Sequence, residues 1–103
     1  MIVVSVMYPA TDGSRFDEAY YLEHHAALLH RLWDGMGLRE ARFLKGMSAP
    51  GGGAPPYQVL ALLTFESADA FKAASRAHGA EIFADIPKFT DVQPLVQINA
   101  VMG

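Results

Sequence analysis

The chain has 103 residues, with eight Lys and Arg against eleven Asp and Glu, no Cys, and a formal net charge of −3. This length suits one domain, and the absence of Cys excludes a disulfide framework, a thiolate nucleophile and a zinc finger. A mildly acidic chain lacks the basic footprint that nucleic-acid binding requires. Hydrophobic residues make up 51% and charged residues 18%, an apolar balance which indicates that a partner covers part of the surface.

No segment has the character of a targeting or membrane-spanning sequence. The N-terminus lacks a charged stretch followed by an apolar run and a cleavage site, and no apolar run approaches the roughly 18 residues that a bilayer requires. We therefore expect a cytoplasmic protein without membrane contact.

Four strands are predicted, at residues 2–8, 38–47, 57–65 and 94–102. The first, third and fourth are apolar on both alternating faces, which is typical of strands that are buried on both sides. The second is less regular because charged residues interrupt it. Residues 48–56 are rich in Gly and Pro and predict a flexible loop.

A long helix is predicted between the first two strands, from Asp17 to about Met36. The Asp17 carboxylate can cap the free N–H groups of its first turn. Phe16 and Tyr21 occupy the two positions of a hydrophobic staple, and Gly37 is placed to end the helix.

A second helix is predicted between the third and fourth strands. Ser67 can cap its start, and Gly79 is expected to end it after His78. Residues 80–86 then predict a separate short helical turn, which Pro87 stops.

The resulting order, βαββαβ, predicts an α+β ferredoxin-like sandwich: an antiparallel four-stranded sheet with two helices on one face. Two helices can cover only one face of the sheet, yet three strands are apolar on both. A second copy of the chain, packed sheet against sheet, would cover the other face, so we expect a homodimer.

His25 lies in the middle of the apolar stripe of the first helix. At about 100° per residue, this stripe also contains six apolar residues: Tyr21, Leu22, Leu28, Leu29, Leu32 and Met36. His24 and His30 fall off the stripe and should be near solvent.

An imidazole on an apolar face needs a polar partner there. His25 is either a general acid or base at the bottom of a pocket, or a structural histidine that bonds a backbone carbonyl or a Tyr hydroxyl. Tyr21 lies one turn away on the same face and could share a proton with His25 or orient a substrate oxygen. The alternative is that Tyr21 only packs as a core aromatic.

Other candidates for a pocket are weaker. His78 stands two turns after Phe71 and should point inward, but in a last helical turn it would equally serve the helix dipole. Tyr8 ends the first strand and Tyr57 begins the third, and either could line a pocket or merely pack.

No metal or cofactor is predicted. His24 and His25 are adjacent, so a regular helix cannot direct both at one metal ion, and no other ligand spacing is present. The sequence has no nucleophile elbow and no dinucleotide fingerprint. Gly51-Gly52-Gly53 is not a phosphate loop, because it lacks the strand-to-helix context and a Lys-Ser/Thr end.

Two stretches resemble the EthD family, which is named for a protein required for ethyl tert-butyl ether degradation. The first stretch holds Tyr8-Pro9, Gly13, Phe16-Asp17, Tyr20-Tyr21, His25 and Leu28. The second stretch runs from Ala84 to Asp91 and continues with Pro94 and Gln97-Ile98. The resemblance covers nearly the whole chain.

The resemblance implies a dimeric α+β barrel, related to muconolactone isomerases, antibiotic-biosynthesis monooxygenases, some polyketide cyclases and haem-degrading enzymes. Related barrels have a pocket between the sheet and the helices. The family histidine of the first helix corresponds to His25 and the Asp of the Asp-x-Pro segment to Asp85, and Phe89 joins the residues expected to bind substrate. One departure is Ala27, where the family often has Pro.

Three functions are then open. The first is cofactor-independent proton transfer on a small, hydrophobic, oxygenated molecule, with His25 and Tyr21 as catalytic residues and Tyr8, Phe65, His78, Asp85 and Phe89 around the substrate. The second is a non-catalytic ligand-binding accessory protein of a catabolic oxygenase or reductase system. The third is a haem-binding member in which His25 or His78 is the axial ligand.

Overall fold

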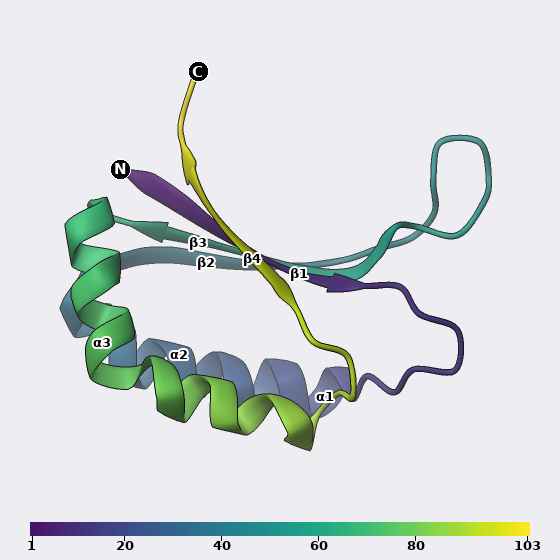
Figure 1. The fold of residues 1–103 in the computed structure, drawn as a ribbon, viewed down its shortest axis with the longest axis horizontal. Helices are drawn as coiled ribbons and strands as arrows, with labels where there is room; N and C mark the ends of the chain where they lie inside the picture. Colours follow the sequence, from purple (N-terminus) through teal and green to yellow (C-terminus); the bar gives the residue numbers. More distant parts are fainter.

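The chain folds into one antiparallel sheet with all of its helices on the same side (Figure 1). The computed structural model describes residues 1–103. The strands are β1 (Ile2–Pro9), β2 (Leu38–Lys45), β3 (Tyr57–Phe65) and β4 (Leu95–Ala100). The observed order is the predicted βαββαβ of a ferredoxin-like fold.

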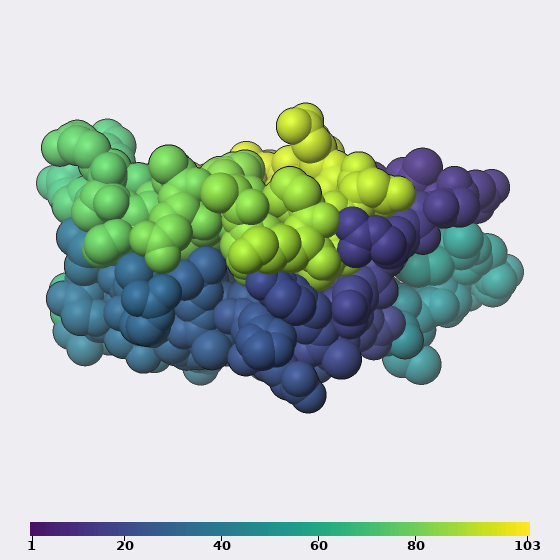
Figure 2. All heavy atoms as spheres, turned by 90° about the horizontal axis from the view of Figure 1, so that it is seen from below, coloured from purple at the N-terminus to yellow at the C-terminus, as the bar shows by residue number.

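The first helical segment contains three kinds of helix in succession. It consists of α1 (Glu18–Tyr20), a π-helical turn η1 (Tyr21–His25), α2 (Ala26–Trp33) and a 3₁₀ turn η2 (Asp34–Met36). The second segment consists of α3 (Ala68–Asp85) and the 3₁₀ turn η3 (Ile86–Lys88). Seen from the helical side, the two segments lie next to each other and cover much of the sheet (Figure 2).

The strand order is β2-β3-β1-β4, so that β1 and β3 are the central strands. Val4 of β1 lies opposite Leu63 of β3 and Ile98 of β4. The central strands are two of the three strands predicted to be apolar on both faces, whereas the third, β4, and the charged β2 are the edge strands. The side chains of Val4 and Leu63 pack beneath the helices, and the alternate residues point to the uncovered face.

The ends of the first helical segment are as the sequence predicts. The carboxylate of Asp17 accepts a hydrogen bond from the backbone N–H of Tyr20 at 3.0 Å. The rings of Phe16 and Tyr21 meet with their centroids 5.1 Å apart, which confirms the hydrophobic staple. Gly37 ends the segment with φ 102°, in the left-handed region that favours glycine.

The second helix is longer than predicted. Ser67 caps it as expected, but α3 continues through Gly79 to Asp85, so the predicted end at Gly79 and the separate turn over 80–86 are wrong. A glycine inside a helix costs only about 1 kcal/mol relative to alanine, and burial of Ile82 on the following turn outweighs that cost. His78 therefore lies within the helix and not in its last turn.

The π turn changes which side chains face the sheet. The backbone N–H of Ala26 donates to the carbonyl of Tyr21, five residues back, as in a π-helix. Each residue of such a turn rotates the chain less than an α-helical residue does. Leu22, predicted to lie on the apolar stripe, is consequently 55% exposed, while Tyr21 and His25 are both buried.

The interior contains two hydrophobic clusters. The larger cluster is mainly aliphatic and includes the aromatic rings of Trp33 and Phe65. The smaller cluster lies at the other end and consists of Tyr8, Tyr21, Val59, Ile86 and Phe89. None of the helices combines the length and apolar character that crossing a bilayer requires.

Candidate functional site

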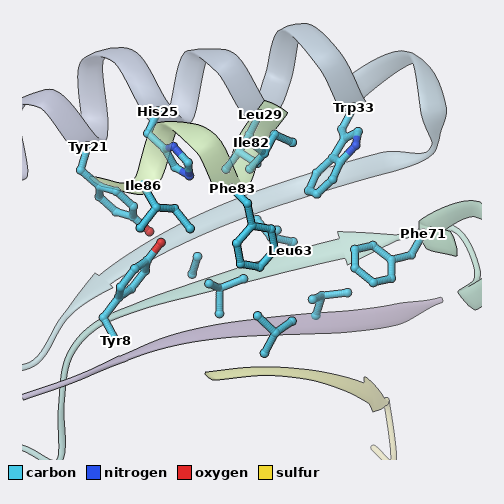
Figure 3. A pocket seen from close by; sticks show the side chains of 14 residues that line it. Tyr8, Tyr21, His25, Leu29, Trp33, Leu63, Phe71, Ile82, Phe83 and Ile86 are labelled. Atoms are coloured by element: carbon cyan, nitrogen blue, oxygen red, sulfur yellow. The ribbon is translucent and has the colours of Figure 1, made fainter. Parts of the chain in front are cut away.

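A cavity lies between the sheet and the two helical segments (Figure 3). Its volume is about 480 Å³, including space that is open to solvent, and nearly all of its lining residues are hydrophobic. Tyr8 comes from β1, while Tyr21 and His25 come from the first helical segment. Phe71 and Phe83 come from α3. The cavity is thus built from the three elements that the fold brings together.

His25 is the central polar residue of this cavity. It ends the π turn, is 3% exposed, and its ring projects from the helix towards the cavity (Figure 3). Its Nδ1 lies 2.9 Å from Oδ2 of Asp85, the last residue of α3. The two helical segments therefore meet at a buried imidazole–carboxylate pair.

The carboxylate of Asp85 also interacts with side chains other than His25. Its Oδ1 accepts a hydrogen bond of 2.7 Å from the hydroxyl of Tyr20. The ammonium of Lys88, one turn further on, lies 3.9 Å from the same oxygen. A carboxylate that is 8% exposed is thus satisfied on both oxygens by partners from both helical segments.

Burial lowers the pKa of His25 below its ordinary value, although the hydrogen bond to Asp85 acts in the opposite direction. Burial acts to raise the pKa of Asp85, but the hydrogen bonds from Tyr20 and His25 outweigh it, and the pKa of Asp85 is lowered. At neutral pH the pair is therefore a neutral imidazole beside a carboxylate.

These charge states fix the tautomer of His25. An ionised carboxylate only accepts hydrogen bonds, so Nδ1 of His25 must carry the proton and donate it to Asp85. Nε2 is then unprotonated and has a free lone pair. No protein group forms a hydrogen bond with Nε2. Because every fully buried side-chain nitrogen or oxygen in the protein does have a partner, Nε2 is not fully buried and is accessible from the cavity that His25 lines. This is the arrangement of a general base.

Two tyrosine hydroxyls lie near His25. Tyr8 and Tyr21 approach from opposite walls of the cavity, and their oxygens point towards each other (Figure 3). Neither hydroxyl forms a hydrogen bond within the protein. Since no fully buried side-chain oxygen lacks a partner, neither hydroxyl is fully enclosed by protein. Burial raises the pKa of both, with a further contribution to Tyr21 from Tyr8, so both stay protonated and can donate a hydrogen bond.

Aromatic rings hold His25 in place. The ring of Tyr21 stacks on the imidazole at an interplanar angle of 14°, and the centroid of Phe89 lies 4.7 Å from it. The carbonyl of Phe89 accepts a 2.7 Å hydrogen bond from the N–H of Asp17, which ties the loop after η3 to the start of the first helical segment. This bond holds Phe89 at the start of the first helical segment, where its ring contacts the imidazole.

Five of the seven predicted site residues meet in one place. Tyr8, Tyr21 and His25 line the cavity, and Asp85 and Phe89 contact His25 from behind. The other two lie elsewhere. Phe65 is fully buried against the rings of Trp33 and Phe71 and does not line the cavity, and the half-buried His78 lines no cavity.

Sequence reasoning missed Tyr20 and Phe83. Tyr20 falls off the apolar stripe of the first helix, so helical periodicity gave no signal for it. Its role depends on Asp85, which lies 65 residues further along the chain. Phe83 falls in residues 80–86, where a separate turn was expected in place of the last part of α3.

No group of three or more His, Cys, Asp or Glu side chains is placed to share a metal ion. His30 pairs with Asp34 on the surface at 2.9 Å, away from the cavity. His25 is engaged with Asp85, and its remaining nitrogen is the one polar atom that it offers to a ligand.

The comparisons with known proteins agree on one family. The model of the EthD domain matches residues 11–93. The crystal structure of an EthD-like protein from Ralstonia eutropha JMP134 is 37% identical, with a TM-score of 0.91 over 99% of this chain and 92% of that chain. An ethyl tert-butyl ether degradation family protein from Bacillus halodurans C-125 is 19% identical, with a TM-score of 0.78 over 99% of each chain.

A more distant structure shares the fold. A dimeric ferredoxin-like protein of unknown function from Thermobifida fusca YX is 15% identical, with a TM-score of 0.59 over 97% of this chain and 90% of that chain. A search among curated proteins finds no match to this chain.

Proposed function

Since the chain belongs to the EthD family, we propose that it binds a small, hydrophobic, oxygenated molecule beside His25 and moves a proton on it without a cofactor. The observation that carries this proposal is the buried pair of His25 and Asp85, joined at 2.9 Å at the edge of an apolar cavity. A base in that position can act only on a molecule inside the cavity.

The proposed step starts with a carbonyl compound that has a C–H bond next to the carbonyl carbon. Nε2 of His25 takes this proton, and the electron pair of the C–H bond moves to form an enolate. The hydroxyl of Tyr21 or Tyr8 donates a hydrogen bond to the enolate oxygen. Return of the proton from Nε2 to another atom of the same molecule completes an isomerisation, and the enzyme is unchanged.

Asp85 supports this step in two ways. It accepts the proton of Nδ1, which keeps Nε2 free to act as the base. Its negative charge also stabilises the imidazolium that exists while His25 holds the transferred proton. Tyr20 positions Asp85 through its 2.7 Å hydrogen bond and does not itself reach the cavity lining.

The proposal is tested by hydrogen exchange on small methyl ketones and unsaturated lactones in deuterium oxide. Nuclear magnetic resonance would follow deuterium incorporation at the carbon next to the carbonyl. We expect His25→Gln to slow the protein-dependent exchange by about 100-fold. His24→Gln is the matched control, because His24 is the exposed neighbour of His25 and should leave the rate unchanged.

The second function, ligand binding without catalysis, uses the same cavity and is decided by the same experiment. If compounds bind but incorporate deuterium at the same rate with the wild-type protein and with His25→Gln, the proposal of acid–base catalysis is wrong. The protein would then be a ligand-binding member of the family.

We also propose that two copies pair through the uncovered face of the sheet. Four apolar side chains form a continuous row across this face, opposite one another in the strand register: Leu44, Leu60, Met7 and Leu95. The Thermobifida fusca neighbour is described as dimeric, which supports this assembly. Burying such a row between two copies removes apolar surface from water.

Sedimentation at micromolar concentration tests the pairing. We expect about twice the chain mass of 11.2 kDa for the wild-type protein. Leu60→Lys, which places a charge in the middle of the row, should give a monomer, and Lys72→Glu on the outer surface of α3 should not. A wild-type monomer would contradict the proposal.

A further inference from the structure

The geometry points to a ligand that is electrically neutral and that carries its oxygen at one end of an apolar body. This inference rests on the proposed function, because it concerns the molecule that occupies the same cavity. It adds the charge and the orientation of that molecule. Three observations carry it: the charges around the cavity, the position of its hydroxyl groups, and the character of its far end.

The charges around the cavity disfavour an anion. No Lys or Arg lines the cavity, and the one ionised group next to it, Asp85, is negative. The cation nearest to that carboxylate, Lys88, lies 3.9 Å from its Oδ1, and the Lys88 side chain is 66% exposed. The C-terminal end of α3, with its partial negative charge, also points to this region. A carboxylate or phosphate would enter without a counter-ion and lose its hydration.

The hydrogen-bond donors gather at one end. Tyr8 and Tyr21 are 1% and 2% exposed as whole residues, and neither hydroxyl makes a hydrogen bond within the protein, so each oxygen keeps some accessible surface. Their oxygens point towards each other at the end of the cavity where His25 lies (Figure 3). Two neutral donors facing one space suit a carbonyl or ether oxygen, which has two lone pairs and no charge. The proton that His25 removes would then lie next to that oxygen.

The other end offers nothing polar. Trp33 and Phe71 line it, together with aliphatic side chains from the sheet, and Phe83 lies between the two ends (Figure 3). The indole N–H of Trp33 already donates to the carbonyl of Ala74 at 2.9 Å, so it is not available to a ligand. A second polar group on this part of the ligand would lose its hydrogen bonds to water without replacement.

Three small probes of similar size test the expected charge of the ligand and the need for an oxygen separately: acetophenone, benzoate and ethylbenzene. Acetophenone is neutral with one oxygen, benzoate is its anionic counterpart, and ethylbenzene has no oxygen. Binding is measured by titration at pH 8, where His25 is neutral and benzoate is ionised. We expect acetophenone to bind at least about tenfold more tightly than benzoate, because the anion cannot replace its hydration in the cavity.

Two variants locate the cause. Asp85→Asn removes the negative charge next to the cavity, so benzoate should gain affinity relative to acetophenone. The double variant Tyr8→Phe with Tyr21→Phe removes both donors, so acetophenone should bind no better than ethylbenzene. Asp12→Asn is the control for charge, because Asp12 is exposed and makes no side-chain hydrogen bond.

The inference would be overturned by benzoate binding as tightly as acetophenone, or by none of the probes binding to the wild-type protein. Equal affinity for acetophenone and ethylbenzene would overturn the placement of the oxygen between the two tyrosines. Failure of the proposed function looks different. Acetophenone would then bind as expected, but deuterium would enter its methyl group at the same rate with the wild-type protein and with His25→Gln.

Discussion

The two ends of the layer between the sheet and the helices differ in whether the polar groups of their buried aromatic residues are hydrogen-bonded within the protein. At one end, Trp33 packs against Phe65 and Phe71, and its indole N–H is bonded to the carbonyl of Ala74. At the other end, Tyr8 and Tyr21 are as deeply buried, but their hydroxyls have no partner. Both ends are built from aromatic rings that the sheet and the first helical segment contribute, so burial and residue type do not distinguish them.

This contrast indicates which end holds the candidate site. A buried donor that is satisfied within the protein contributes to stability, because its removal leaves an acceptor with fewer partners. A buried donor that faces a cavity contributes little to folding and is available to a ligand. The first end is therefore mainly structural, although Trp33 and Phe71 also line the apolar end of the cavity, and the second end holds the polar groups of the candidate site.

Phe65→Ala is expected to have the largest effect, because it attacks the structural end directly. Phe65 is completely buried between Trp33 and Phe71, so the substitution removes a whole ring and leaves a cavity. We expect a loss of about 3–5 kcal/mol in the free energy of unfolding, measured by urea denaturation. A loss below 1 kcal/mol would show that this end is not tightly packed.

Asp85→Ala tests the polar part of the site end. It leaves Nδ1 of His25 and the hydroxyl of Tyr20 without their partner, at a cost of about 1–3 kcal/mol in the free energy of unfolding. Because folding lowers the pKa of Asp85, its stabilisation is complete above the ordinary value of 3.8 and is lost as the pH falls through the lower, folded value. Urea denaturation at pH 7 and at pH 3 should show the difference from wild type shrinking in acid.

Trp33→Phe tests the hydrogen bond at the structural end. The variant keeps an aromatic ring but loses the hydrogen bond to Ala74. We expect a loss of about 1–2 kcal/mol in the free energy of unfolding. Affinity for acetophenone should change less than stability, because the indole N–H is not offered to the ligand.

Tyr8→Phe is the matching change at the site end and should have the smallest effect on stability. It removes a hydroxyl that has no partner in the protein, so we expect a change of less than about 0.5 kcal/mol. Titration with acetophenone should nevertheless show weaker binding. If the unfolding free energy fell as far as in Trp33→Phe, the hydroxyl would be structural, and the contrast between the two ends would disappear.

The sequence predicts the fold well because its signals are local. Asp17, Ser67 and Gly37 mark the ends of helices by capping and by backbone conformation, and each does so in the structure. Gly79 carries the same kind of signal, but the helix end predicted there is wrong, because the helix continues to pack against the rest of the protein beyond Gly79. A local preference of about 1 kcal/mol cannot show whether the following turn is buried.

Local sequence patterns predict only part of the candidate site. The 3.6-residue periodicity places His25 and Tyr21 on the buried face, but it also places Leu22 there, because nothing in the sequence announces the π turn. The resemblance supplies Asp85. The bond between Tyr20 and Asp85 joins residues 65 positions apart, and only the packing of the two helical segments brings them together.

The two edges of the sheet also differ, and this has a consequence for handling the protein. The β2 edge has four charged residues, which repel the edge strand of another chain. The β4 edge has none within Leu95–Ala100, and Leu95, Val96 and Ile98 are each about half exposed. An uncharged, β-prone segment of this length is a typical starting point for amyloid-like aggregation. Replacing Ile98 with Lys should therefore increase the yield of soluble protein during expression.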